Sequence, residues 1–199
     1  PGEDRGGSYL YNSISSGLKP SPDKVFEASL NRVSHGDGIF GWGSDIAQAQ
    51  WQAFNNLLDF LQKSNIKTII LLPPIAPTVL DTIAVSDKFG YVDGLRLKIS
   101  ETAAAFNMPL FDDHDLRFAG STDCEFIDGA HPGAIAAKRM LLDMAVKDPD
   151  MRTRLKLSEI GWSIAHFKDR ASTLAEEADF LMLGCKKAAS IAPVPPALH

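Results

Sequence analysis

The segment Ile66–Leu72 places the strongest constraint on how this chain folds. It is short, β-branched at its centre and apolar on both faces, a pattern typical of an interior strand in a parallel sheet. Pro73 and Pro74 follow at once and end the strand, because proline cannot donate a hydrogen bond to a ladder. A second short strand is predicted at Leu110–Phe111.

Helical patterns surround these two strands. The clearest is 45–63, where Asp45 is expected to cap a helix with one apolar stripe. Helix, strand, helix, strand and helix in this order predict an α/β fold, a three-layer sandwich with a small parallel sheet between helices. The predicted helices are 23–33, 45–63, 78–89, 91–106, 132–146 and 158–187; the stripe of 45–63 is Ile46, Trp51, Phe54, Leu57, Leu58 and Leu61.

The chain divides into four parts by composition. Residues 1–22 are rich in Gly, Ser and Pro and predict a loop or an edge segment. Residues 23–150 form the α/β domain, and 151–190 are expected to be a C-terminal helical extension. Residues 191–199, with three prolines, form a tail for which no structure is predicted.

Composition excludes some classes of function. Apolar residues make up 45% of the 199 residues and charged residues 23%, as in an ordinary globular domain. The formal net charge of −5 gives no electrostatic reason to expect nucleic acid as a partner. No apolar run is long enough to predict a membrane span. Cys124 and Cys185 either pair or remain free thiols, and their spacing does not decide between these.

The segment Asp128-Gly129-Ala130-His131 carries the most specific chemistry. An aspartate three residues before a histidine on a tight turn can bind one ring nitrogen, which leaves the other free to accept a proton from a nucleophile. Pro132 suits the first turn of the next helix. The alternative is that Asp128 only caps that helix, as an aspartate in this position often does.

This segment resembles the last conserved block of the SGNH (GDSL-type) hydrolases, in which Asp-x-x-His supplies two members of a Ser-His-Asp triad. The strand and Pro-rich loop at 67–74, the strand at 108–113 and the helix after His131 are similar to that family in order and character over roughly Gly38–Ala145. The resemblance is closest to the branch that handles O-acyl groups on cell-surface polysaccharides. It implies a flavodoxin-like sheet, His131 and Asp128 as catalytic residues, an acyl ester as substrate and an extracytoplasmic location.

The chain departs from that family at the nucleophile. No Gly-Asp-Ser occurs, and Gly41-Trp42-Gly43-Ser44-Asp45 lies where the family has Gly-x-Asn-Asp, with Ser44 in place of Asn. Pro1 is not preceded by an initiator Met, so the sequence reads as the C-terminal part of a longer protein or as a degenerate relative. Two functions follow: a serine ester hydrolase or O-acyltransferase acting on acylated carbohydrate, and a non-catalytic module that binds carbohydrate or a partner.

Four further residues are candidate ligand contacts: Trp42, Ser44, Asp112 and His114. Trp42, in a Gly-rich loop, offers a flat face to a sugar ring, whereas Trp51 on the apolar stripe is expected in the core. Ser44 either stabilises an oxyanion at a helix N-terminus or caps that helix.

The acidic run 112–115 is either a metal site, together with Asp128 and His131, or a solvated loop at the end of a strand. Adjacent acids on an extended segment point to opposite faces, which favours the loop, so no cofactor is expected. Nothing in the sequence indicates the oligomeric state.

Overall fold

The computed structural model describes residues 2–3, 9–10, 23–173, 179 and 181–185. Its centre is a two-stranded parallel sheet of β3 (Ile70–Leu72) and β4 (Leu110–Asp112), with Ile70 opposite Leu110. The helices α4 (Pro77–Ala84) and α5 (Tyr91–Ala105) connect the two strands. The predicted α/β class and the parallel pairing are therefore confirmed, although β3 begins at residue 70 rather than 66.

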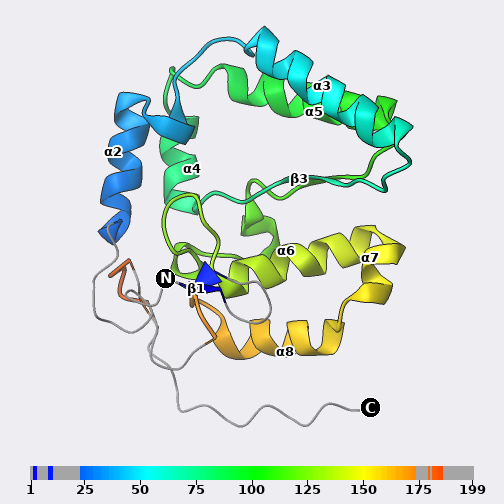
Figure 1. Cartoon of the computed structure of the whole chain (residues 1–199). Coiled ribbons are helices and arrows are strands. Elements are labelled where there is room, and N and C mark those ends of the chain that lie inside the picture. The colour runs from blue at the N-terminus through cyan, green and yellow to red at the C-terminus, as the bar shows by residue number, and fades with distance from the viewer. Residues whose placement is uncertain (1, 4–8, 11–22, 174–178, 180, 186–199) are drawn as a thin grey trace.

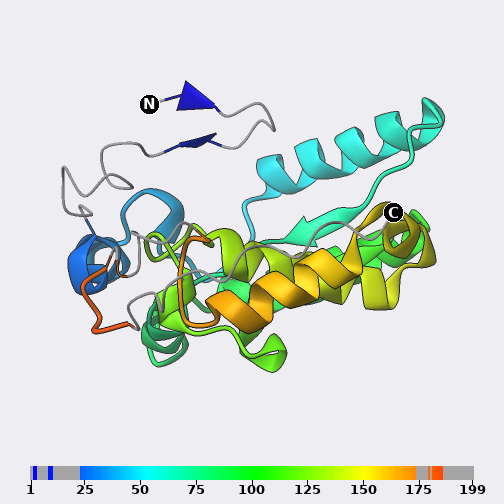
Figure 2. The same cartoon turned by 90° about the horizontal axis from the view of Figure 1, so that it is seen from below.

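Helices flank this sheet (Figure 1). The helix α3 (Gln48–Lys63) lies beside α5 on one side, while α6 (Ala134–Lys147), α7 (Pro149–Arg154) and α8 (Leu157–Phe167) lie on the other. In Figure 2, α3 and α8 lie on opposite sides of β3. The remaining elements are β1 (Gly2–Glu3) and β2 (Tyr9–Leu10), which pair antiparallel, α2 (Glu27–His35), and the short 3₁₀ helices 24–26, 38–40, 116–119 and 123–125.

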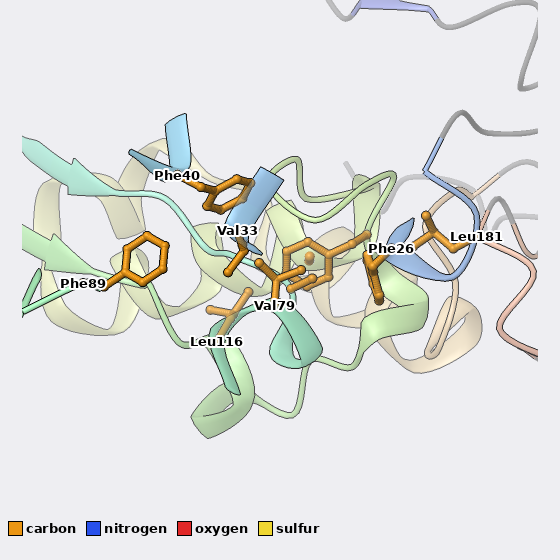
Figure 3. Close-up of a cluster of buried hydrophobic side chains, with 10 residues drawn as sticks. Phe26, Val33, Phe40, Val79, Phe89, Leu116 and Leu181 are labelled. Atoms are coloured by element: carbon orange, nitrogen blue, oxygen red, sulfur yellow. The ribbon is translucent and has the colours of Figure 1, made fainter. Parts of the chain in front are cut away.

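Two apolar clusters hold the domain together. The smaller joins Leu58 of α3, Ile70 of β3 and Ile99 of α5. The larger packs α2 against α4 and the loop before α6 (Figure 3), so it supports the segment that carries Asp128 and His131. Its buried members are Phe26, Val33, Phe40, Ala76, Val79, Phe89, Leu116, Phe126, Ala136 and Leu181.

The predicted helix at 45–63 is partly wrong. It begins at Gln48, and Ala47 rather than Asp45 occupies the capping position. Leu58 is its one fully buried residue, while the Leu57 side chain is 53% exposed. The reason is the small size of the sheet beside α3. Its two described strands, β3 and β4, offer too little surface to cover a stripe of six residues.

The predicted helix at 158–187 is also wrong in length, since α8 ends at Phe167. Asp169 then takes a positive φ of 63°, and the carbonyl oxygen of Ala171 accepts the N–H of Ala134 at the start of α6. The chain after α8 therefore turns back onto the start of α6 and does not continue the helix through Ala171. A helix over 158–187 would pack through Leu174, Ala178, Leu181 and Met182. Leu181 does pack in the core, but Met182 is exposed, and Leu174 and Ala178 lie outside the described residues.

Cys124 and Cys185 form a disulfide that ties the end of the described chain to the loop before Asp128. Across the described segments, no helix has both the length and the apolar character needed to cross a membrane.

Candidate functional site

The structure brings Asp128 and His131 together as predicted. One carboxylate oxygen of Asp128, Oδ1, accepts the backbone N–H groups of Ala130 and His131, each at 2.8 Å. The His131 Nδ1 lies 2.9 Å from Oδ1 and 2.8 Å from Oδ2. An aspartate that bonds its own turn in this way is held in place, and its contact with Nδ1 favours the tautomer that carries a proton there.

The other ring nitrogen of His131, Nε2, makes no hydrogen bond with any described residue. The side chain of His131 is 62% exposed and that of Asp128 is 32% exposed. Among the described residues, no hydroxyl group hydrogen-bonds to the His131 ring. The Nε2 atom is therefore free to accept a proton from a group that approaches from outside this part of the chain.

The turn is closed by backbone contacts rather than by a helix. The N–H of Ile127 donates to the carbonyl oxygen of His131 at 3.0 Å, and Phe126 forms an isolated bridge with Pro132. The helix α6 begins only at Ala134, so the expected place of Pro132 in its first turn is wrong. Pro132 instead lies at the end of the turn, where it forms the bridge with Phe126.

A buried ion pair lies directly before this turn. Glu125 is fully buried, and its two carboxylate oxygens accept hydrogen bonds from Nε and Nη2 of Arg139 at 2.8 and 2.9 Å. Ser121 Oγ donates to the same carboxylate at 3.0 Å. Arg139 is therefore the partner of a buried salt bridge. The role of Glu125 was missed, because a lone acid in a loop gives no sign of burial.

Asp112 and His114 do not join the Asp128–His131 pair. The carboxylate of Asp112 accepts a hydrogen bond from Nε of Arg96 at 2.9 Å and forms an ion pair with Nη2 at 2.7 Å. The His114 Nδ1 lies 3.3 Å from the carbonyl oxygen of Pro73, and burial lowers the pKa of this imidazole. No described hydrogen bond or ion pair connects either residue with Asp128 or His131, so both remain predictions as ligand contacts.

The expectation of a solvated acidic loop is wrong for Asp113. Its side chain is fully buried, and no described residue donates a hydrogen bond to either of its oxygens. Burial, followed by the neighbouring Asp143 carboxylate, raises its pKa from 3.8 to about 6. Protonated Asp113 can donate a hydrogen bond to Asp143, which explains how two acids lie side by side. No three metal-binding side chains cluster anywhere in the described segments.

Ser44 does not lie at a helix N-terminus. Its hydroxyl donates to Oδ2 of the neighbouring Asp45 at 2.8 Å, and α3 begins at Gln48. Ser44 therefore does not cap α3, and its role as a ligand contact stays a prediction.

Trp42 borders an aromatic cavity of about 430 Å³. Its indole N–H donates to the carbonyl oxygen of Val33 at 2.9 Å, which fixes the ring. Trp51, expected in the core, is only partly buried and lines the same cavity. Phe54, Tyr91, Leu95, Ile99, Gly41, Gly43, Asp45, Ile46, Ala47 and Gln50 complete the lining.

Comparisons of the chain with protein-family models, with curated proteins and with solved structures give no match.

Proposed function

We propose that the chain carries the base of an SGNH-like serine ester hydrolase or O-acyltransferase that acts on acylated carbohydrate. The observation that supports this most is the pairing of both Asp128 oxygens with Nδ1 of His131, on an exposed side chain whose Nε2 makes no hydrogen bond with a described residue. An orienting carboxylate, an imidazole and an accessible second nitrogen are what a serine nucleophile requires.

In this proposal the serine lies outside the described residues. Its Oγ attacks the acyl carbonyl carbon, and Nε2 of His131 accepts the hydroxyl proton. Asp128 stabilises the resulting imidazolium, which then gives the proton to the departing carbohydrate oxygen. Water or another carbohydrate hydroxyl attacks the acyl-enzyme in the second half, and His131 again accepts and returns one proton.

The disulfide between Cys124 and Cys185 supports an extracytoplasmic location. Disulfides persist in oxidising compartments and are rare in the cytosol. Cell-surface polysaccharides are found on that side of the membrane, so location and proposed substrate agree.

A serine-directed fluorophosphonate tests the proposal and identifies the nucleophile. We expect one serine to be labelled in the longest polypeptide that the gene encodes, with the adduct located by mass spectrometry. Labelling should slow strongly in His131→Ala and remain unchanged in His166→Ala, because the ring of the exposed His166 bonds the Trp162 carbonyl oxygen within its own helix. Equal labelling of both variants would contradict the proposal.

The aromatic cavity favours a second candidate, a module that binds carbohydrate without cleaving it. Aromatic faces suit the apolar faces of sugar rings, and Asp45 and Gln50 offer polar atoms at the same cavity. Acylated oligosaccharides should then quench tryptophan fluorescence, and Trp42→Ala should abolish the change. Trp162→Ala is the control, since Trp162 stacks on His166 instead. Binding without any release of the acyl group would favour this candidate over the enzyme.

A further inference from the structure

A buried carboxylate from the start of the domain reaches the residue between Asp128 and His131. The backbone N–H of Gly129 donates to Oδ2 of Asp23 at 2.8 Å, and Ser29 Oγ lies 3.2 Å from the same nitrogen. Asp23 and Gly129 are 106 positions apart in the sequence. The contact therefore joins the first helical segment of the domain directly to the candidate site.

Asp23 and Ser29 are already fixed to each other. Ser29 Oγ donates to Oδ2 of Asp23 at 2.5 Å, and the N–H of Ser29, in the first turn of α2, donates to Oδ1 at 2.7 Å. Only 3% of Asp23 and 4% of Ser29 are exposed. Hydrogen bonds to a buried carboxylate are among the strong ones, so α2 holds this acceptor rigidly against the turn.

The peptide group that follows, which carries the carbonyl of Gly129, is held as well. Its carbonyl oxygen accepts the N–H of Ala76, next to α4, at 3.1 Å. A Cβ at position 129 would overlap the side chain of Ser29 and would lie 2.9 Å from Cγ2 of Val79. Glycine is thus required here by close packing, and the peptide between Asp128 and His131 cannot shift without breaking contacts to α2 or α4.

We propose that Asp23 and Ser29 are positioning residues for the Asp128–His131 pair. They anchor the Gly129 peptide so that the Asp128 carboxylate keeps facing Nδ1 of His131. The inference rests on the proposed function in one respect, because that function gives the orientation of the pair its purpose.

Nuclear magnetic resonance of protein labelled with ¹⁵N in histidine and glycine tests this without an activity assay. In the wild-type chain we expect His131 to carry its proton on Nδ1, and we expect the Gly129 amide to exchange slowly. In Asp23→Asn, one acceptor oxygen replaces the two that bind Ser29 and Gly129. Exchange of the Gly129 amide and of the His131 ring proton should then accelerate by about tenfold to a hundredfold.

Two further variants test whether the change in exchange rates is specific to the Asp23 carboxylate. Asp87→Asn should leave both exchange rates unchanged, because the Asp87 side chain is 86% exposed. Ser29→Ala should shift both rates in the same direction as Asp23→Asn but less, since the carboxylate still accepts from Gly129; it decides the question if Asp23→Asn does not fold. Wild-type rates in a folded Asp23→Asn would overturn the positioning role alone. A wild-type His131 without a proton on Nδ1 would overturn the pair itself, and with it the proposed function.

Discussion

Arg139 of α6 binds both carboxylate oxygens of Glu125, three residues before Asp128. A third donor of Arg139, Nη1, binds the carbonyl oxygen of Ala119 at 2.7 Å. The backbone oxygen of Glu125 accepts the N–H of Gly133, just beyond the turn. The ion pair therefore closes the base of the Asp128–His131 turn from inside the domain.

Breaking the Arg139–Glu125 pair should lower the stability of the fold substantially. Arg139→Met leaves a buried carboxylate without its cation, which typically lowers the free energy of unfolding by roughly 3–5 kcal/mol. Arg117→Met is the matched control, because the exposed Arg117 bridges Asp81 and Asp115, and such pairs contribute about 0–1 kcal/mol. Urea unfolding of both variants measures the difference, and similar losses would show that burial of Glu125 does not matter.

Stability should fall as pH rises through the range in which Asp113 titrates. Its pKa in the fold is raised to about 6 from 3.8, so between these values the folded chain holds a proton that the unfolded chain has lost. The contribution of protonated Asp113 to the free energy of unfolding is complete below about pH 4 and is lost as pH rises through about 6. Asp113→Asn, which stays neutral, should remove this slope and be the more stable protein at neutral pH.

Asp115→Asn provides a control in which the pH dependence of stability should change in the opposite direction. Hydrogen bonds from Arg117 lower the pKa of Asp115, so its contribution is present at neutral pH and is lost on acidification. Urea unfolding across the acidic to neutral range would distinguish the two variants. An unchanged slope in Asp113→Asn would mean that another group causes the pH dependence.

Both cysteines should be unreactive until they are reduced. The disulfide closes a loop of 61 positions between Cys124 and Cys185, and removal of such a crosslink typically costs about 2–5 kcal/mol. Thiol titration in denaturant should find none before reduction and both afterwards. The double substitution to serine should lower the melting temperature, and free thiols in the unreduced protein would contradict the pairing.

The sequence predicted what depends on local patterns. The apolar run before Pro73 identified β3, and the spacing of Asp128 and His131 identified a contact that needs only four residues of one turn. The packing of α3 could not be predicted in the same way. Its apolar stripe shows which face seeks cover, but the surface available to it depends on how many strands the sheet contains.

Contacts between distant segments were also beyond the sequence. Nothing near Asp23 indicates that its carboxylate meets Gly129, and nothing near Asp113 indicates full burial. Both acids occur in polar stretches that resemble surface loops, and only the folded chain brings apolar neighbours over them. Burial of a single acid is set by tertiary packing, which has no local signature.

The decisive measurement for the role of His131 is the rate of acyl release by His131→Ala. The assay compares acetate release from an acetylated polysaccharide by the wild-type protein, His131→Ala and His166→Ala, all in the longest polypeptide that the gene encodes. We expect His131→Ala to lose roughly three or more orders of magnitude in kcat while His166→Ala keeps the wild-type rate. An active wild-type protein whose rate is unchanged by His131→Ala would contradict this role.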